Sequence, residues 1–358
     1  MYEPSRPSPF IDLAAVEAWD AWFRWREGSR LRDFSIEDTW RRVSAALASV
    51  EAQSARKTWQ ACFMDAFATW RLLPDERLVA AAGTGRITWG HGPLHAIVNA
   101  AAFVRHDRNP GSSIDLEGLR GTANLAVRML DDAALLAGTA APRLRIGLTG
   151  VADALALLGS GYDSDAGREL AGALGRALAE GCLRGSVDLA AARGGDAADL
   201  HSVAARAMAR GMPTDLLKAL RQSGTRHGQL TAITSQGRLA LLANNIADAL
   251  DPLRGENHAN HIAAANGPRM IRSSGYALNL LRARDENRPA KPDTLAHLPC
   301  KAQIGMRATL QPWIDEPIAY PMLAMRGLGE DDLREARLEA ASRGFDALTF
   351  RDPAAVTS

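Results

Sequence analysis

The four residues Ser235-Gln236-Gly237-Arg238 have the types and spacing of a phosphate-binding turn. They follow a short β-prone run, Leu230 to Thr234, and precede an apolar, helix-prone segment that continues to Asp251-Pro252. A strand, a glycine turn and a helix start direct backbone N–H groups at one point, and the helix dipole favours an anion there. A single glycine between a strand and a helix is often only a turn, so this structural alternative stays open.

Two histidines are the other candidates for ligand chemistry. His258 and His261 are three residues apart, a spacing that would place both rings on one face of a helix. A structural or catalytic metal site needs three or four protein ligands. Apart from Glu256, no carboxylate or cysteine lies nearby in the sequence to complete the set. We therefore predict no metal site.

The three cysteines are widely spaced and form no Cys-x-x-Cys motif. Cys182 continues a stripe of leucines at four-residue intervals, which predicts a core-facing, unreactive thiol. Cys62 lies on a predicted N-terminal helix beside Phe63. Cys300 follows a proline-rich stretch, so we expect it to be exposed, and it is the one cysteine whose reactivity is worth testing.

Composition limits the class of protein. The chain has 358 residues, of which 47% are hydrophobic, so it can bury a large core. Its 42 basic and 41 acidic residues nearly cancel, which predicts neither a nucleic-acid surface nor a polybasic membrane patch. The first residues lack the apolar core of a signal peptide, and no apolar run is long enough to span a membrane. We expect a cytoplasmic protein.

Helical patterns dominate the first part of the chain. The segment from Asp12 to Arg26 carries aromatic residues on one face, which we interpret as packing rather than as a base-stacking surface. Ser35 and Asp38 have the spacing of a capping box that opens the next helix. A third helix is predicted from Ala55 to Trp70.

The turn resembles a segment of the adenosylcobalamin-dependent (class II) ribonucleotide reductases, Leu-Thr-Ala-Ile-Ala-Pro-Thr-Gly-Thr-Ile-Ser, in which it binds the substrate phosphate. Here Ser235, Gln236, Gly237 and Arg238 stand where that family has Pro, Thr, Gly and Thr. The resemblance implies that these four residues form a degenerate substrate-phosphate site. Other blocks resemble the same family in the same order: residues 35–43, 71–85, 114–132, 145–155, 306–315 and 347–350.

The resemblance breaks at Ile87 to His95. In the family this part leads to the first redox cysteine, a phosphate loop and the Asn-Pro-Cys-Gly-Glu finger loop, and none of these is in the sequence. Pro93 stands in place of the second redox cysteine, and only Asn99 matches among the polar residues of the following strand. Family chemistry needs a thiyl radical near the sugar and a redox cysteine pair. We therefore expect no catalytic residues and no ribonucleoside-diphosphate reductase activity from the chain alone.

The family fold is a ten-stranded α/β barrel made of two half-barrels, and the missing section removes most strands of the first half. We therefore expect a helix-rich α/β protein with a helical N-terminal region, residues 1–85, and a degenerate ribonucleotide-reductase-like half-barrel, residues 86–358. The exposed edges of such a sheet need to be covered or to bind a partner.

The resemblance implies a role in deoxyribonucleotide metabolism through binding. The ligand would be a nucleotide held near Gly237 and Arg238, or the partner would be a reductase chain or a second copy of this chain. We expect no cofactor, and adenosylcobalamin only if the family activity is retained. One alternative is an authentic reductase component that is active only with another chain. Another is a helix-rich protein that reuses the fold for an unrelated purpose. Arg238 either strengthens anion binding as a charged donor or fills the space that a substrate once occupied.

Overall fold

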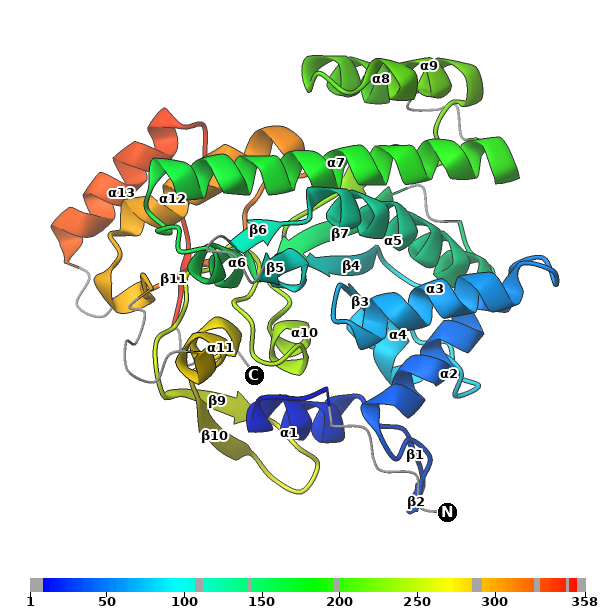
Figure 1. Ribbon diagram of the computed structural model, residues 1–358, viewed down its shortest axis with the longest axis horizontal. Coiled ribbons are helices and arrows are strands. Elements are labelled where there is room, and N and C mark those ends of the chain that lie inside the picture. Colours follow the sequence, from blue (N-terminus) through cyan, green and yellow to red (C-terminus); the bar gives the residue numbers. More distant parts are fainter. Residues whose placement is uncertain are drawn as a thin grey trace.

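The computed structural model describes residues 9–106, 112–140, 143–195, 200–284, 292–324, 329–345 and 348–352. Its centre is a four-stranded sheet (Figure 1) with the strand order β3 (Leu72–Pro74), β4 (Leu94–Asn99), β7 (Arg143–Thr149) and β8 (Gln229–Thr231). β3 is antiparallel to β4, whereas β4, β7 and β8 are parallel. The helix-rich α/β class is confirmed, and within the described residues the sheet does not close into a barrel.

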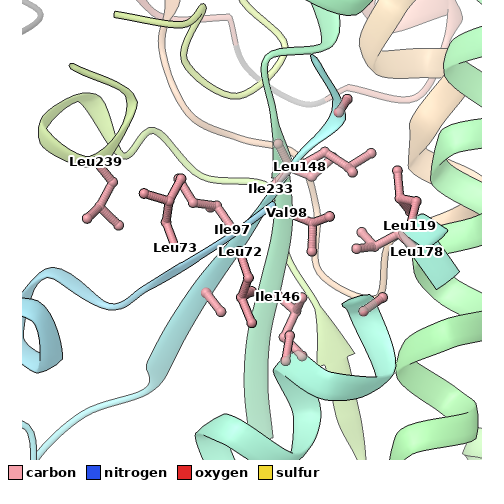
Figure 2. Close-up of a cluster of buried hydrophobic side chains, with 14 of the residues drawn as sticks. Leu72, Leu73, Ile97, Val98, Leu119, Ile146, Leu148, Leu178, Ile233 and Leu239 are labelled. Carbon is pink, nitrogen blue, oxygen red and sulfur yellow. The ribbon is translucent and has the colours of Figure 1, made fainter. Parts of the chain in front are cut away.

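Side chains alternate between the two faces of this sheet, as they must along extended strands. Val98 and Leu148 point to one face, which is covered by α5 (Leu116–Leu136) and α7 (Asp165–Arg193) (Figure 2). Ile97 points to the opposite face. All three side chains are buried. Burial on both faces explains why the middle of these strands is apolar without interruption.

Helices α5 and α7 approach each other closely because α7 presents glycines to α5. A Cβ atom at Gly181 would lie 2.3 Å from the carbonyl oxygen of Arg120, and one at Gly185 would lie 2.8 Å from that of Asn124. Both distances are too short for a side chain at these positions. Cys182 is fully buried in this interface, as predicted from its stripe.

The N-terminal part consists of α1 (Leu13–Trp22), α2 (Ile36–Ala48), α3 (Arg56–Ala68) and α4 (Glu76–Ala81), with a short hairpin of β1 (Arg26–Glu27) and β2 (Arg30–Leu31). The first helix ends earlier than predicted, because Arg26 already belongs to β1. Trp19 and Phe23 are buried, which confirms that the aromatic face serves packing. The predicted cap of α2 is present, since Asp38 accepts a hydrogen bond from the backbone N–H of Ser35 at 3.0 Å.

The N-terminal helices and the sheet share one hydrophobic core. Trp40 and Phe67 belong to the same buried cluster as Ile146 and Leu178. The proposed boundary after residue 85 falls between β3 and β4, which pair with each other. The division into a helical N-terminal region, residues 1–85, and a partial barrel, residues 86–358, remains a prediction.

The remaining elements surround this centre (Figure 1). They are η1 (Ala100–Phe103), β5 (Val104–His106), β6 (Ser112–Ile114), α6 (Val151–Leu157), α8 (Leu200–Ala209), α9 (Thr214–Ser223), α10 (Gly237–Leu242), β9 (His258–Ile262), β10 (Arg269–Ser273), α11 (Tyr276–Arg284), η2 (Leu295–His297), α12 (Cys300–Leu310), η3 (Gln311–Trp313), β11 (Met322–Leu323), α13 (Glu330–Ser342) and β12 (Phe350–Arg351). β12 pairs in parallel with β11. The closing strand thus begins at Phe350, later than the predicted 347–350, and Ala347 lies outside the described residues.

The free edge of β8 is covered by the chain itself. The backbone N–H groups of Leu230 and Thr231 donate to one carboxylate oxygen of Asp315, at 2.9 and 3.2 Å. The N–H of Glu316 donates to the carbonyl of Thr231 at 3.2 Å. This sheet edge therefore needs no second chain to satisfy it. Among the described helices, none combines the length and the apolar character that crossing a membrane requires.

Candidate functional site

The predicted phosphate turn lies at the carboxyl end of β8. The strand ends at Thr231, an extended stretch follows, and α10 begins at Gly237. The predicted order of strand, turn and helix is therefore present. In parallel α/β sheets, ligands bind beyond the carboxyl ends of the strands, and this turn occupies such a position.

Two of the four predicted residues are engaged by a carboxylate of the chain. The Ser235 hydroxyl donates to Asp248 at 2.5 Å, and the Gln236 backbone N–H donates to the other oxygen of Asp248 at 2.8 Å. The N–H groups of the first turn of α10, at Gly237 and Arg238, have no acceptor within the helix. An anion at this turn therefore has those N–H groups as donors, while Ser235 and Gln236 hold Asp248.

Arg238, the second residue of α10, lies on the surface with its side chain toward the N-terminal helices α1 and α4. Its guanidinium carbon is 5.2 Å from the centre of the Trp22 ring, and its Nη1 is 3.9 Å from Glu76. The side chain is 44% exposed. Such weak, exposed contacts contribute little to stability and leave the guanidinium free to exchange Glu76 for another anion.

The helix after the turn is much shorter than predicted. We expected helical structure to Asp251, but α10 ends at Leu242. Asn244 and Asn245 have φ angles of 65° and 59°, in the left-handed region that asparagine tolerates better than most residues. Ala249 also has a positive φ of 49°. The chain therefore turns away from the helix and folds back across the sheet.

The segment 243–250 covers the carboxyl ends of the parallel strands. The carbonyl of Ala247 accepts hydrogen bonds from the Thr149 hydroxyl at 3.0 Å and from the Gly150 N–H at 2.9 Å. Asp153, at the start of α6, accepts the N–H of Ala247 at 2.7 Å and that of Ala277 at 2.9 Å. The place where a barrel enzyme would open its active site is thus occupied by backbone of the chain itself.

A cavity of about 30 Å³ remains behind the turn, with room for only a few water molecules. Gly237, Asp153, Asp248 and Asp251 are among the residues that line it. A corrin cofactor does not fit a space of this size, because pockets for even drug-sized ligands measure about 300 Å³ or more. We therefore assign no step of chemistry to cobalamin here.

The acidic side chains around this cavity have raised pKa values because they are buried. Burial raises the pKa of Asp153 to about 6 and that of Asp251 to about 7, and it also raises the pKa of Asp248. Arg351 of β12 counteracts the last two shifts, since its guanidinium contacts both carboxylates. One cation cannot neutralise two buried carboxylates. At least one of the two therefore takes up a proton more readily than an exposed carboxylate does. This cluster ties the C-terminal strand to the cover of the sheet.

His258 and His261 do not share a helix face. Both residues lie on strand β9, where residues three apart point to opposite faces. His258 is largely buried, its Nε2 lies 3.3 Å from the amide nitrogen of Asn245, and burial lowers its pKa to about 4. Across the described ranges, no group of three or more His, Cys, Asp or Glu side chains is arranged to hold a metal ion.

The three cysteines lie in three different parts of the fold, and none forms a disulfide. Cys62 is half-buried on α3, and Cys182 is buried between α5 and α7. The prediction that Cys300 is exposed is wrong. Its side chain packs with Ile304 and Met322 at the start of α12, and burial raises the pKa of its thiol. All three cysteines belong to the described residues and lie on the helices α3, α7 and α12, not on the loops at the carboxyl ends of the parallel strands.

Several residues at the site were not singled out from the sequence. Asp153 lies within a block that resembles the family, but its residue type alone did not indicate a role. Asp248 and Arg351 lie about a hundred residues apart and meet only through folding. The sequence did contain an indication for Asp153. It follows Gly150 and lies in the first turn of a helix, a position where an acidic side chain commonly interacts with backbone N–H groups.

Most of the chain matches a known protein family. Residues 95–349 match the family model described as ribonucleotide reductase, barrel domain. The matched range contains β4, β7 and β8, the turn at Gly237 and the C-terminal elements to α13. It excludes the N-terminal helices. A search of curated proteins found no match.

Proposed function

Because the chain belongs to the ribonucleotide reductase family, we propose that it is a catalytically inactive member that acts in deoxyribonucleotide metabolism by binding. The observation that carries this proposal is the location of the thiols. The family chemistry begins at a cysteine sulfur next to the sugar and ends with the oxidation of two neighbouring cysteines. In this chain the three thiols are separated from each other and from the strand ends.

The environment of the thiols supports the same proposal. A thiolate is the reactive form of cysteine, and burial disfavours it. Burial raises the pKa values of both Cys182 and Cys300, so both remain protonated at neutral pH. Cys62 is half-buried on the outer helix α3. The subclass that uses adenosylcobalamin remains part of the proposal, because the resemblance in the turn is to that subclass.

What the chain binds follows from the part of the site that stays accessible. We propose a nucleotide, whose phosphate contacts the first-turn N–H groups of α10 and the guanidinium of Arg238. Arg238 is exposed and only loosely paired with Glu76, so it can reach an anion at Gly237 without unfolding its surroundings. A reductase chain is the partner that the family suggests for a nucleotide-binding relative of this kind.

Activity is tested first. The purified chain is incubated with ribonucleoside di- and triphosphates, adenosylcobalamin and a dithiol, and deoxynucleotides are quantified. We expect none, and the triple variant Cys62→Ala, Cys182→Ala, Cys300→Ala to give the same background. Deoxynucleotide formation that depends on any of the three cysteines would overturn the proposal of inactivity. Formation only after a reductase chain is added would identify the protein as a reductase component.

Binding is tested by thermal shift with the same nucleotides. A ligand at about 100 times its Kd stabilises the native state by about 2.7 kcal/mol, which is a readable shift. Arg238→Ala is expected to remove this shift while leaving the unliganded melting temperature within about 1 °C. Arg221→Ala, an exposed arginine on α9, is the matched control and is expected to bind as the wild type does. Equal binding by both variants would exclude Arg238 from the site.

A further inference from the structure

A second and larger cavity lies at the opposite ends of the parallel strands. Its volume is about 390 Å³, within the range of small-molecule pockets. The loop before β4 forms one wall, through Gly90, Gly92 and Pro93. The first residues of β7 and Glu316 form the other. Because this cavity opens at the amino ends of β4 and β7, it is separate from the turn at Gly237.

The charged residues of the cavity leave one arginine without a partner. Arg145 forms a two-pronged pair with Glu316, with Nε–Oε1 and Nη2–Oε2 distances of 2.9 and 2.7 Å. Arg143 is two residues earlier on β7 and lines the same cavity. Within the described part of the chain, the guanidinium of Arg143 makes neither a hydrogen bond nor an ion pair. The lining thus has an excess of one positive charge.

The titratable neighbours do not cancel this charge. His95 is opposite Arg145 in the pairing of β4 with β7. Burial lowers the pKa of His95, so its ring is neutral at pH 7. Asp75 is engaged by Arg77, with an Oδ2–Nη2 distance of 2.6 Å. Among the described residues that line the cavity, Glu316 is the only carboxylate, and it is already paired with Arg145.

The walls of the cavity are held in place before any ligand arrives. Arg77 donates to the carbonyls of His91 and Pro93, at 2.7 and 2.8 Å, and so fixes the loop before β4. The indole N–H of Trp89 donates to the carbonyl of Ala133 at 2.9 Å, and this ring is only 2% exposed. A preformed cavity lowers the entropic cost of binding.

We propose that this cavity binds a phosphate monoester, with the phosphate on the guanidinium of Arg143 and the organic part against Pro93, Leu94 and Ala140. A guanidinium matches two phosphate oxygens at once, and the unpaired Arg143 supplies that group beside an apolar wall. The size of the cavity suits a sugar phosphate or a mononucleotide. This assignment does not depend on whether the protein has reductase activity.

Isothermal titration with ribose 5-phosphate, adenosine monophosphate, inorganic phosphate and malonate tests the assignment. We expect both esters to bind the wild type and to bind more tightly than inorganic phosphate. Arg143→Ala is expected to weaken ester binding about ten- to hundredfold, the usual effect of removing a charged hydrogen bond. Arg221→Ala is the control and is expected to bind within twofold of the wild type. Preference between the two esters shows whether the site takes a sugar or a nucleotide.

Three results would overturn the assignment. They are an absence of ester binding, equal binding by wild type and Arg143→Ala, and binding of malonate as tight as that of the esters. Arg143 is exposed and unpaired, so its replacement leaves the fold intact, and equal melting temperatures of the two proteins verify this. Arg238→Ala separates the two sites. If it keeps ester binding while Arg143→Ala loses it, the ligand occupies this cavity and not the turn.

Discussion

Asp248 binds the turn that was predicted to bind phosphate: its carboxylate accepts the Ser235 hydroxyl at 2.5 Å and the Gln236 N–H at 2.8 Å. A carboxylate and a phosphate are recognised by the same kinds of donor, so Asp248 occupies two of the donors that the sequence resemblance assigned to a phosphate. These two hydrogen bonds hold the turn in shape without a bound ligand. It also gives Asp248 a structural role with measurable consequences.

Replacing Asp248 separates its charge from its hydrogen bonds. In Asp248→Ala, the Ser235 hydroxyl, the Gln236 N–H and one contact of Arg351 lose their acceptor, and we expect a loss of about 3–5 kcal/mol in the free energy of unfolding. Asp248→Asn retains one acceptor oxygen and should lose less. Urea denaturation of the two variants measures the difference. Equal losses would show that the hydrogen bonds to the turn contribute nothing.

Arg351 is the only described cation that contacts both Asp248 and Asp251. Arg351→Ala leaves two buried carboxylates without this cation and detaches β12 from the cover of the sheet. We expect a loss of about 3–5 kcal/mol in unfolding free energy. Arg334→Ala, on the exposed face of α13, breaks a surface pair with Asp331 and should change stability by less than about 1 kcal/mol. Similar effects of the two substitutions would contradict a stabilising role for the buried cluster.

The features of this site that can be predicted from the sequence are those formed by residues close together in the chain. The turn at Gly237, the core position of Cys182 and the cap at Ser35 are local patterns, and the structure contains all three. The early end of α10 was missed because a tertiary demand, closing the strand ends, overrides helix propensity in 243–250. The exposure of Cys300 was misjudged because its cover, β11 and α13, comes later in the chain.

The acids around the small cavity predict how stability depends on pH. Burial raises the pKa of Asp251 from 3.8 to about 7 in the folded state. A raised pKa means that the folded state binds a proton more tightly than the unfolded state does. The stabilisation is therefore complete below pH 4 and is lost as the pH rises from about 4 to 7. His258 acts in the opposite direction, because its lowered pKa makes stability increase with pH over 4 to 6.5.

Comparing the wild type with Asp251→Asn isolates the first effect, since His258 is present in both proteins. The unfolding free energy of the wild type minus that of the variant should fall as the pH is raised from 5 to 7.5. Each unit of pKa shift corresponds to about 1.4 kcal/mol. Urea denaturation at several pH values provides the curve. A difference that is constant with pH would mean that Asp251 has the same pKa in the folded and unfolded states.

The contact between α5 and α7 gives a prediction with a control on the same helix. In Gly181→Ala the new methyl group would lie 2.3 Å from the carbonyl of Arg120, so the helices must separate. We expect a loss of about 1–3 kcal/mol or more, because overpacking outweighs the better helix propensity of alanine. At Gly172 the nearest atom would be the Thr309 methyl at 3.6 Å, an ordinary contact. Gly172→Ala should therefore stabilise the protein by up to about 1 kcal/mol. Denaturation of both variants tests this, and a stabilising Gly181→Ala would mean that α7 is able to move away from α5 at little cost.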